Sequence, residues 1–390
     1  MFRDSFLSLS VSGITSLFAG IALAVTTGTL EELPGLLLLV PAALALKGNI
    51  FGALGSRLGT SIHTGTFRLS ARLDTVVGAN VAAALALNLV MAVVVALLAK
   101  GVAIVFAISP TISVADFIVV SAVGGLLSSA IVLAIALLLA SGSVRYGWDL
   151  DNVVSPLVSA SSDCASLPAL VLAAQIVGTP VLVPVLAGVL VLLAAASLLW
   201  AVISRIDLFR AIIRESIPVL VVAALLDLIA GITIEKRLDD FLAYPVLLVL
   251  LPGFLSTAGS LGGVLSSRLA TKVHLGLIEL GPVPRGSAGS DIAMIFTLSV
   301  PVFVITGMMA ELGGRMTDQA SPGVLDVVLV AVVGGLIATV FVGLVAYYVT
   351  IVAVRFGLDP DTYGIPMVTS ALDFVGAFAL ILAIVAVGVT

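Results

Sequence analysis

The sequence predicts an all-α, polytopic membrane protein with about eleven transmembrane helices, arranged as two parallel five-helix repeats joined by a linker helix. The first observation is composition: 61% of the 390 residues are hydrophobic and only 10% are charged, and the mean hydropathy is +1.31. A soluble globular protein is about half apolar and about a quarter charged. The second is that apolar stretches of about 18 residues or more recur along the chain, each long enough to cross a bilayer as a helix.

The third observation is an internal repeat. The stretch LVPAALALKGNIFGALGSRLGTSIHTG at 39–65 recurs as LLPGFLSTAGSLGGVLSSRLATKVHLG at 250–276, an offset of 211 residues (250 − 39). After one deletion the offset becomes 210 (373 − 163), and it holds to the end of the second half. The aligned pairs include Pro41 with Pro252, Gly48 with Gly259, Arg57 with Arg268, Gly125 with Gly335 and Asp163 with Asp373. Matches this regular over a whole half indicate a duplicated unit.

The expected helices follow from the apolar stretches taken in order. The first repeat, residues 1–178, is expected to hold helices at 6–26, 33–53, 76–98, 115–141 and 153–177. A linker helix at 179–203 lies in the segment 179–204. The second repeat, residues 205–390, is expected to hold helices at 212–232, 243–265, 290–310, 324–350 and 363–388.

The linker helix decides the relative orientation of the repeats. Five crossings bring the chain to the opposite side of the membrane, and a sixth returns it, so the two repeats run parallel about an axis along the membrane normal. A single chain then imitates a homodimer, which removes the need for a second copy and allows a monomer; whether the chain works alone or in a larger assembly stays open. Most Lys and Arg residues fall in the segments that this count places on the side of the N-terminus. We therefore expect a multi-pass protein of the cell membrane with a cytoplasmic N-terminus and an external C-terminus.

Acidic residues in the fifth helix of each repeat are the strongest candidates for function, because ionisable residues are expensive at membrane depth. These helices read WDLDNVVSPLVSASSDCASLPALVLA and LDPDTYGIPMVTSALDFVGAFALILA. Polar residues recur at every fourth position and so share one helical face: Asp151, Ser155, Ser159 and Asp163 in the first, and Asp361, Thr369 and Asp373 in the second. Pro156 and Pro366 are expected to interrupt the two helices and expose backbone carbonyls to a wet cavity.

If both fifth helices face the axis, Asp163 and Asp373 meet near the middle of the membrane. Two bare carboxylates close together in a low dielectric do not both stay ionised, and a divalent cation between them resolves that conflict. Oxygen ligands with no Cys or His cluster favour Mg²⁺ or Ca²⁺ over zinc or copper. So few carboxylates, flanked by hydroxyls, suit Mg²⁺, which keeps several of its waters. The alternative is that each Asp caps a broken helix or pairs within the bundle.

Further oxygen ligands are expected from neighbouring positions. Asp149 and Asp359, with Asp151 and Asp361, stand at the cytoplasmic start of the fifth helices, where they cap the helix, concentrate cations at an acidic mouth, or do both. Ser159 and Thr369 extend the hydroxyl face.

The second helix of each repeat supplies the last two candidates. Pro41 and Pro252 are expected to bend or interrupt these helices, with turns at Gly48-Asn49 and Gly259-Ser260 that present Asn49 and Ser260 beside the fifth helix. Lys47 is expected to snorkel towards the interface. The role of Asp227, a lone acid aligned with Ser16, is left open between modulation of transport and a bond to a neighbouring helix.

The same residues carry a resemblance to a known family. VPAALALKGNIFGALGSRLGTSIHTG resembles the second-helix signature of the solute carrier 41 group, relatives of the MgtE-type magnesium channels, and LDPDTYGIPMVTSALDFVGA is similar to their fifth-helix signature. The resemblance implies a Mg²⁺-conducting pore on the pseudo-twofold axis, with Asp163 and Asp373 as Mg²⁺ ligands. It places Asp149 and Asp359 towards the cytoplasmic side of the pore. Ser260 departs from the family pattern, which has Asn, so a ligand there is weaker or absent.

We therefore expect a transporter of Mg²⁺, channel-like or a carrier, and not an enzyme. Its expected partners are the Mg²⁺ ion and the lipid bilayer, with no nucleic acid. One alternative is a proton- or sodium-coupled carrier of another solute. Another is an intramembrane aspartyl protease with Asp163 and Asp373 as its dyad, but these follow Ser162 and Leu372 rather than the Tyr or Gly of such enzymes.

Overall fold

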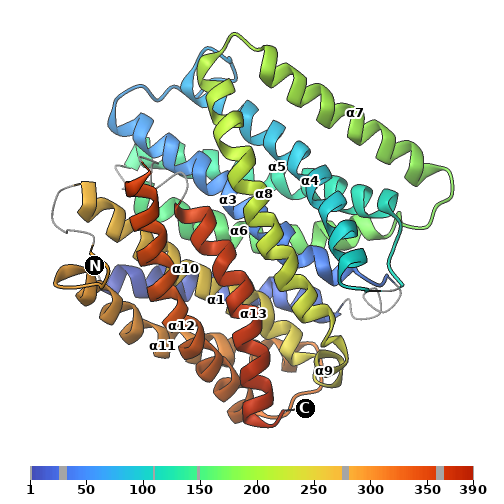
Figure 1. Ribbon diagram of the computed structural model, residues 1–390, viewed down its shortest axis with the longest axis vertical. Helices are drawn as coiled ribbons and strands as arrows, with labels where there is room; N and C mark the ends of the chain where they lie inside the picture. The colour runs from blue at the N-terminus through green and yellow to red at the C-terminus, as the bar shows by residue number, and fades with distance from the viewer. Residues whose placement is uncertain are drawn as a thin grey trace. The chain divides into compact units, whose positions relative to one another are not determined.

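The fold is that of a helical membrane protein. The computed structural model describes residues 2–25, 33–108, 110–146, 150–274, 281–356 and 364–389, and within them every regular element is a helix. The helices are α1 (Phe2–Val25), α3 (Leu36–His63), α4 (Val76–Val105), α5 (Val114–Tyr146), α6 (Leu150–Ala174), α7 (Leu182–Ile203), α8 (Asp207–Glu235), α9 (Leu238–Ala243), α10 (Val246–His274), α11 (Ser287–Met316), α12 (Val324–Arg355) and α13 (Ile365–Val387) (Figure 1).

The helices confirm the predicted class. Each of the expected segments corresponds to one long helix, and the short α9 is an addition. Within the described residues, 9 helices are long and apolar enough to span a membrane, and two shorter apolar stretches, Gly13–Val25 and Ala160–Ala174, lie in α1 and α6. The chain is therefore an all-α, multi-pass membrane protein.

The repeat found in the sequence reappears in the helix boundaries. Helix α11 starts and ends 211 residues after α4 (287 − 76 and 316 − 105). Helix α12 starts 210 residues after α5 (324 − 114), so the single deletion falls in the loop between these helices. The boundaries of these helices thus keep the spacing of the sequence repeat.

The expected interruption of the second helix of each repeat is wrong, while a bend at the proline, the other expectation, stays a prediction. Helix α3 continues through both Pro41 and Asn49, and α10 continues through Pro252. Each proline lies close to the start of its helix, where it removes one backbone hydrogen bond and leaves the rest of the ladder intact. Asn49 and Ser260 are consequently presented from a helix rather than from a turn.

The expected interruption of the fifth helix is also wrong. Helix α6 runs unbroken through Pro156. Pro366 lies in the first turn of α13, where the missing N–H has no intrahelical partner to lose and the fixed φ suits the helix. Of the two prolines, then, one is accommodated inside a helix and the other begins one.

The described helices form two compact units, and each is considered by itself. Unit 1 holds Met1–Thr27 and Ile229–Thr390, and unit 2 holds Gly28–Leu228. In unit 1, α1 packs against α10 and α11 (Figure 1), and α10 also contacts α12 and α13. A Cβ at Gly20 would overlap the backbone carbonyl of Val249, so the absence of a side chain lets α1 approach α10 closely. The compact units therefore differ from the expected sequence repeats, whose boundaries stay a prediction.

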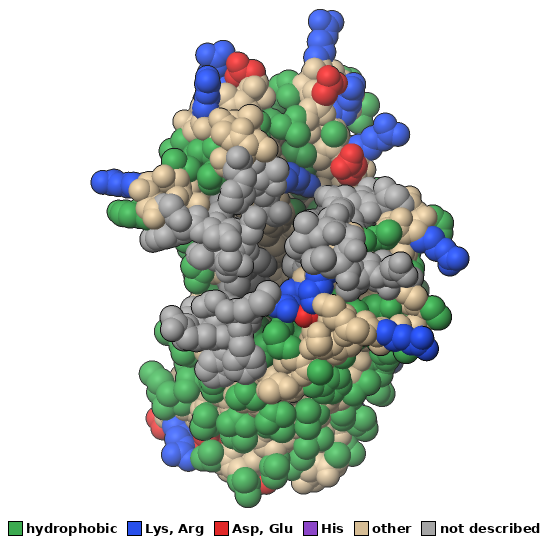
Figure 2. Space-filling model, turned by 90° about the vertical axis from the view of Figure 1, so that its left-hand side faces the viewer, with side chains coloured by type: hydrophobic (Ala, Val, Ile, Leu, Met, Phe, Trp, Pro, Cys, Tyr) green, Lys and Arg blue, Asp and Glu red, His purple; other side chains and the backbone are tan. Residues whose placement is uncertain are grey.

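In unit 2, helices α3, α4, α5 and α6 pack on one another, and α7 lies along α4 and α5 (Figure 1). Helix α7 turns most of its apolar surface outward, since only 22% of its most apolar window is buried. In Figure 2, hydrophobic side chains cover much of the lower part of the face shown, while Lys and Arg side chains lie mostly at the top, at the sides and near the centre. An apolar surface of this extent is expected where lipid covers the protein.

Candidate cation site

In unit 2, the candidate residues lie on two helices that pack together. Asp163 on α6 is 6% exposed and Asn49 on α3 is 7% exposed. The neighbour of Asp163, Ser162, donates a hydrogen bond from Oγ to the carbonyl of Leu44 at 3.2 Å, which joins α6 to α3. A carboxylate and an amide are thus both buried on adjacent helices. A cation bound there would offset the free energy that these groups lose when they are removed from water.

Unit 1 repeats this arrangement with α10 and α13. A Cβ at Gly259 would lie 3.9 Å from Thr369, so the two helices approach closely at the level of the candidates. Thr369 Oγ1 donates a hydrogen bond to the carbonyl of Pro366 at 3.1 Å. Asp373 and Ser260 are half-buried on the same two helices. Each unit therefore carries one acidic helix and one helix with a polar ligand candidate beside it.

Several expected ligands cannot be placed. Asp149, Asp359 and Asp361 lie outside the described residues, and for Asp151 and Ser159 only the backbone in α6 is described. Within the part of the chain that is described, no group of three or more His, Cys, Asp or Glu side chains lies close enough to hold a metal ion. Asp163 belongs to unit 2 and Asp373 to unit 1, so their meeting stays a prediction.

Lys47 differs from expectation. Its side chain is 2% exposed, and its ammonium donates a hydrogen bond to Oδ1 of Asn88 on α4. Asn88 Nδ2 donates in turn to the carbonyl of Gly125 on α5 at 3.3 Å. The lysine therefore points into the bundle and does not snorkel to the interface. The signal in the sequence was Asn88 itself, an amide in the middle of the apolar stretch 81–99 of α4.

A small cavity of about 10 Å³ lies beside the Lys47 ammonium, between α3, α4, α5 and α6. Its polar lining comes from Ser121, Ser128 and Ser166. This volume is roughly that of one water molecule. The first repeat thus holds a polar interior around a buried cation, next to the helices that carry Asn49 and Asp163.

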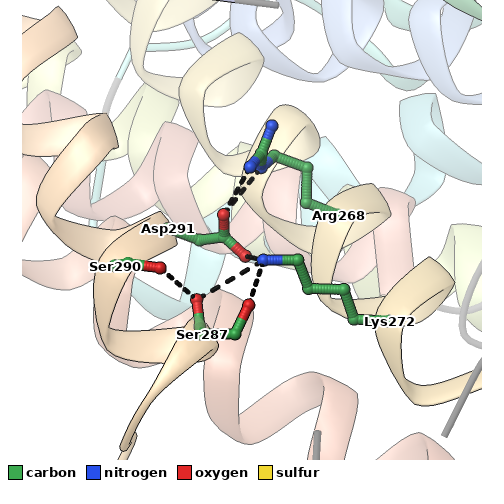
Figure 3. Close-up of polar contacts among 5 residues, drawn as sticks. All are labelled: Arg268, Lys272, Ser287, Ser290 and Asp291. Atoms are coloured by element: carbon green, nitrogen blue, oxygen red, sulfur yellow. Dashed lines mark hydrogen bonds and ion pairs between the residues drawn. The ribbon is translucent and has the colours of Figure 1, made fainter. Parts of the chain in front are cut away.

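A second polar cluster, which sequence reasoning missed, joins α10 to α11 (Figure 3). Asp291 is 2% exposed and accepts from Arg268 and Lys272, each at 2.5 Å. Lys272 also donates to Ser287 Oγ at 2.5 Å. Only the packing of the two helices brings these residues together, because 19 residues separate Lys272 from Asp291 in the chain.

Apolar spanning helices that carry carboxylates at membrane depth are typical of membrane proteins that move ions. Comparison with known families then identifies the chain. A family model described as "Divalent cation transporter", MgtE, matches residues 40–173 and 251–383. The protein belongs to the MgtE family of divalent cation transporters and is not an enzyme. The two matches cover α3 to α6 and α10 to α13, the same elements of each repeat.

The chain is also similar to proteins named solute carrier family 41 member 2. The relative from Xenopus laevis is 24% identical over 95% of this chain and 69% of its own length. Those from Mus musculus and Homo sapiens are 25% and 24% identical over 88% of this chain and 63% of their lengths. The chain thus spans about two thirds of these relatives. No solved structure matches the chain significantly.

Proposed function

We propose that the protein moves Mg²⁺ across the membrane through a pore between the two repeats, on their pseudo-twofold axis, with a central site made by Asp163 and Asp373. The observation that carries the proposal is that the divalent cation transporter model matches the chain twice, and both matches include an acidic residue at the same place in the fifth helix. Two such carboxylates supply the charge that balances a dication.

The chemistry of the surrounding residues favours a hard, hydrated ion. Mg²⁺ binds oxygen ligands and keeps several waters, so it needs few protein ligands. In each unit a helix with a neutral oxygen candidate packs beside the acidic helix: α3, with Asn49, beside α6, and α10, with Ser260, beside α13. Hydroxyls of Ser159 and Thr369 extend the site, and Asp149, Asp151, Asp359 and Asp361 form its acidic mouth.

The membrane potential is sufficient to drive uptake through such a site. A dication that crosses ~100 mV gains ~4.6 kcal/mol, twice the ~2.3 kcal/mol of a single charge. Efflux against that potential needs a coupled ion. Direction and coupling are therefore separable in a sealed system where voltage and ion gradients are set independently.

The test uses the full chain in proteoliposomes that contain a Mg²⁺ indicator. A voltage imposed with K⁺ and valinomycin, without Na⁺ or H⁺ gradients, is expected to drive Mg²⁺ uptake. Asp163→Asn and Asp373→Asn should each abolish that uptake. The control is Asp74→Asn, since Asp74 is exposed and paired only with exposed Arg72. Wild-type flux in both central variants would overturn the site. Uptake only with a Na⁺ or H⁺ gradient would show a coupled Mg²⁺ carrier in place of voltage-driven conduction, and no Mg²⁺ uptake under any gradient would favour a carrier of another solute.

A further inference from the structure

The cavity beside Lys47 is bordered by two polar groups whose hydrogen bonds are incomplete. The Lys47 ammonium has three N–H groups, and among the described residues the structure gives it one hydrogen-bond partner, Oδ1 of Asn88. Ser166 on α6 lines the same cavity and is 1% exposed. Its Oγ has no hydrogen-bond partner within the described parts of the chain. Two buried polar groups on facing helices therefore border one small space with no bond between them.

Two further hydroxyls line the cavity from α5. Ser121 Oγ and Ser128 Oγ each donate a hydrogen bond to a backbone carbonyl at 2.8 Å. Because the hydroxyl hydrogen is used in that bond, the lone pairs of each oxygen remain available as acceptors. The lining thus offers hydrogen-bond donors from Lys47 and Ser166, and acceptors from all three serines.

The second repeat lacks these polar groups at the aligned positions. Lys47 corresponds to Ala258 at an offset of 211 (258 − 47). At an offset of 210, the three serines of the cavity correspond to small residues without a hydroxyl: Ser121 to Ala331, Ser128 to Ala338 and Ser166 to Gly376. The polar lining is therefore a feature of the first repeat and not of the shared fold.

An aromatic pair fills the corresponding space in the second repeat. A Cβ at Gly335 would overlap the ring of Phe303 on α11, and a Cβ at Gly376 on α13 would lie 3.8 Å from the ring of Phe254 on α10. The two rings pack on each other with centroids 5.1 Å apart. Apolar bulk thus occupies the place between these helices.

In the first repeat the lysine takes the place of the rings. The positions aligned with Phe254 and Phe303 are Ala43 and Ala92 (254 − 43 and 303 − 92, both 211). A Cβ at Gly125, which is aligned with Gly335, would lie 3.2 Å from Lys47 Nζ and 3.6 Å from Ala92 Cβ. One lysine side chain replaces two phenyl rings incompletely, and a cavity of about 10 Å³ remains.

The size and the lining of this cavity together indicate its ligand. A space of about 10 Å³ accommodates one water molecule if polar partners surround it. Water both donates and accepts, whereas a halide ion only accepts and would face the lone pairs of Ser121 and Ser128. A second cation would be repelled by the ammonium. We propose that the cavity binds one water molecule, which accepts a hydrogen bond from Lys47 Nζ and donates one to Ser166 Oγ.

The bound water joins α3 to α6 next to the candidate cation ligands. Ser166 follows Asp163 by three residues and so lies on the same side of α6, and Lys47 precedes Asn49 by two residues on α3. A bond through water is nearly as favourable in enthalpy as a direct one. The first repeat thus uses a hydrated contact where the second uses packed rings. The water site does not rest on the proposed transport of Mg²⁺.

The direct test is a crystal structure of the full chain at a resolution that shows ordered water. A density peak about 2.5–3.2 Å from both Lys47 Nζ and Ser166 Oγ is expected. A second crystal, soaked in bromide, should show no anomalous signal in the cavity. An anomalous peak there would identify an anion site and overturn the proposal. A direct bond between Lys47 and Ser166, or a cavity without density, would overturn it as well.

The second test is a double-mutant cycle on thermal unfolding of the full chain in detergent. Ser166→Ala removes one partner of the water and is expected to lower the apparent Tm by roughly 1–3 °C. In a Lys47→Met background the same substitution should have less than about half that effect, because the water has already lost its donor. Equal losses from Ser166→Ala in the two backgrounds would contradict a shared water.

Ser129 supplies the matched control for this cycle. Its Oγ is also buried without a hydrogen-bond partner among the described residues, and Ser129 does not line the cavity. Ser129→Ala is therefore expected to change the apparent Tm by the same amount with and without Lys47→Met. If Ser129→Ala depended on Lys47 as strongly as Ser166→Ala does, the coupling would not come from the cavity, and the proposal would fail.

Discussion

Lys47 donates a hydrogen bond to Asn88 inside the helical bundle, and Asn88 donates a second hydrogen bond to the carbonyl of Gly125. One amide therefore links α3, α4 and α5. Helix α3 is tied to α6 as well, through the bond from Ser162 to Leu44. The helix that carries Asn49 is thus held from three sides, as expected for an element that must present a ligand at a fixed position.

Removal of the Asn88 amide is expected to destabilise the protein. Asn88→Leu leaves the Lys47 ammonium and the Gly125 carbonyl without this partner, at a cost of about 1–3 kcal/mol. Thermal unfolding in detergent measures the loss. The matched control is Ser299→Ala at the aligned position, because Ser299 Oγ bonds only within its own helix, to Phe296. Equal effects of the two substitutions would contradict a special role for Asn88.

Close contact between α1 and α10 predicts a strong effect at Gly20. Gly20→Ala places a methyl group against the Val249 carbonyl and is expected to cost about 1–3 kcal/mol through overpacking. Gly101→Ala on α4 is the control, since a Cβ there meets nothing within 4 Å, and a gain of up to about 1 kcal/mol is expected from helix propensity. A neutral Gly20→Ala would show that α1 does not pack tightly in this position.

The Asp291 cluster predicts that removal of the buried Asp291 carboxylate destabilises the protein more than removal of an exposed carboxylate. Asp291→Asn leaves Arg268 and Lys272 facing each other, and a loss of about 2–4 kcal/mol is expected, somewhat less than for a fully buried pair because both cations are partly solvated. Asp74→Asn breaks the exposed pair with Arg72 and should cost under about 1 kcal/mol. High salt should reduce the loss at buried Asp291 only slightly and the loss at exposed Asp74 more strongly.

Binding of Mg²⁺ to the proposed central site predicts a shift in stability. At a concentration of about 100 times Kd, Mg²⁺ should stabilise the folded protein by about 2.7 kcal/mol. The shift is expected to disappear in Asp163→Asn and in Asp373→Asn and to persist in Asp74→Asn. Persistence in both central variants would mean that Mg²⁺ binds elsewhere. The same titration with Mn²⁺ and Co²⁺ measures selectivity.

Much of the fold was predictable because a membrane-spanning helix requires a long stretch of apolar residues, which is visible in the sequence. The boundaries of α4 and α11, or of α5 and α12, follow from the repeat and from loops rich in turn residues. The predicted interruptions at the prolines were wrong because the effect of a proline on a helix depends on its position. Pro366 lies in the first turn of its helix, and Pro41 removes a single hydrogen bond near the start of another. Sequence gives the residue but not how the neighbouring helices accommodate it.

The polar contacts were less predictable, since they depend on which helices face each other. Lys47 was expected at the interface, yet α4 presents Asn88 to it inside the bundle. The cluster of Asp291 with Arg268 and Lys272 was not predicted, because it depends on how α10 and α11 pack together. The acidic positions Asp163 and Asp373 were found because the duplication repeats them. Their packing partners α3 and α10 were expected from the same argument.

The association of α1 with α10 also bears on how the protein is made. Gly20 leaves the ribosome 229 residues before Val249 (249 − 20), which at ~5–20 residues per second is roughly 10–50 s of translation. During that interval the first helix lies in the bilayer without the neighbour it packs against. The packing of α1 against α10 is therefore completed only when the second half of the chain has been made.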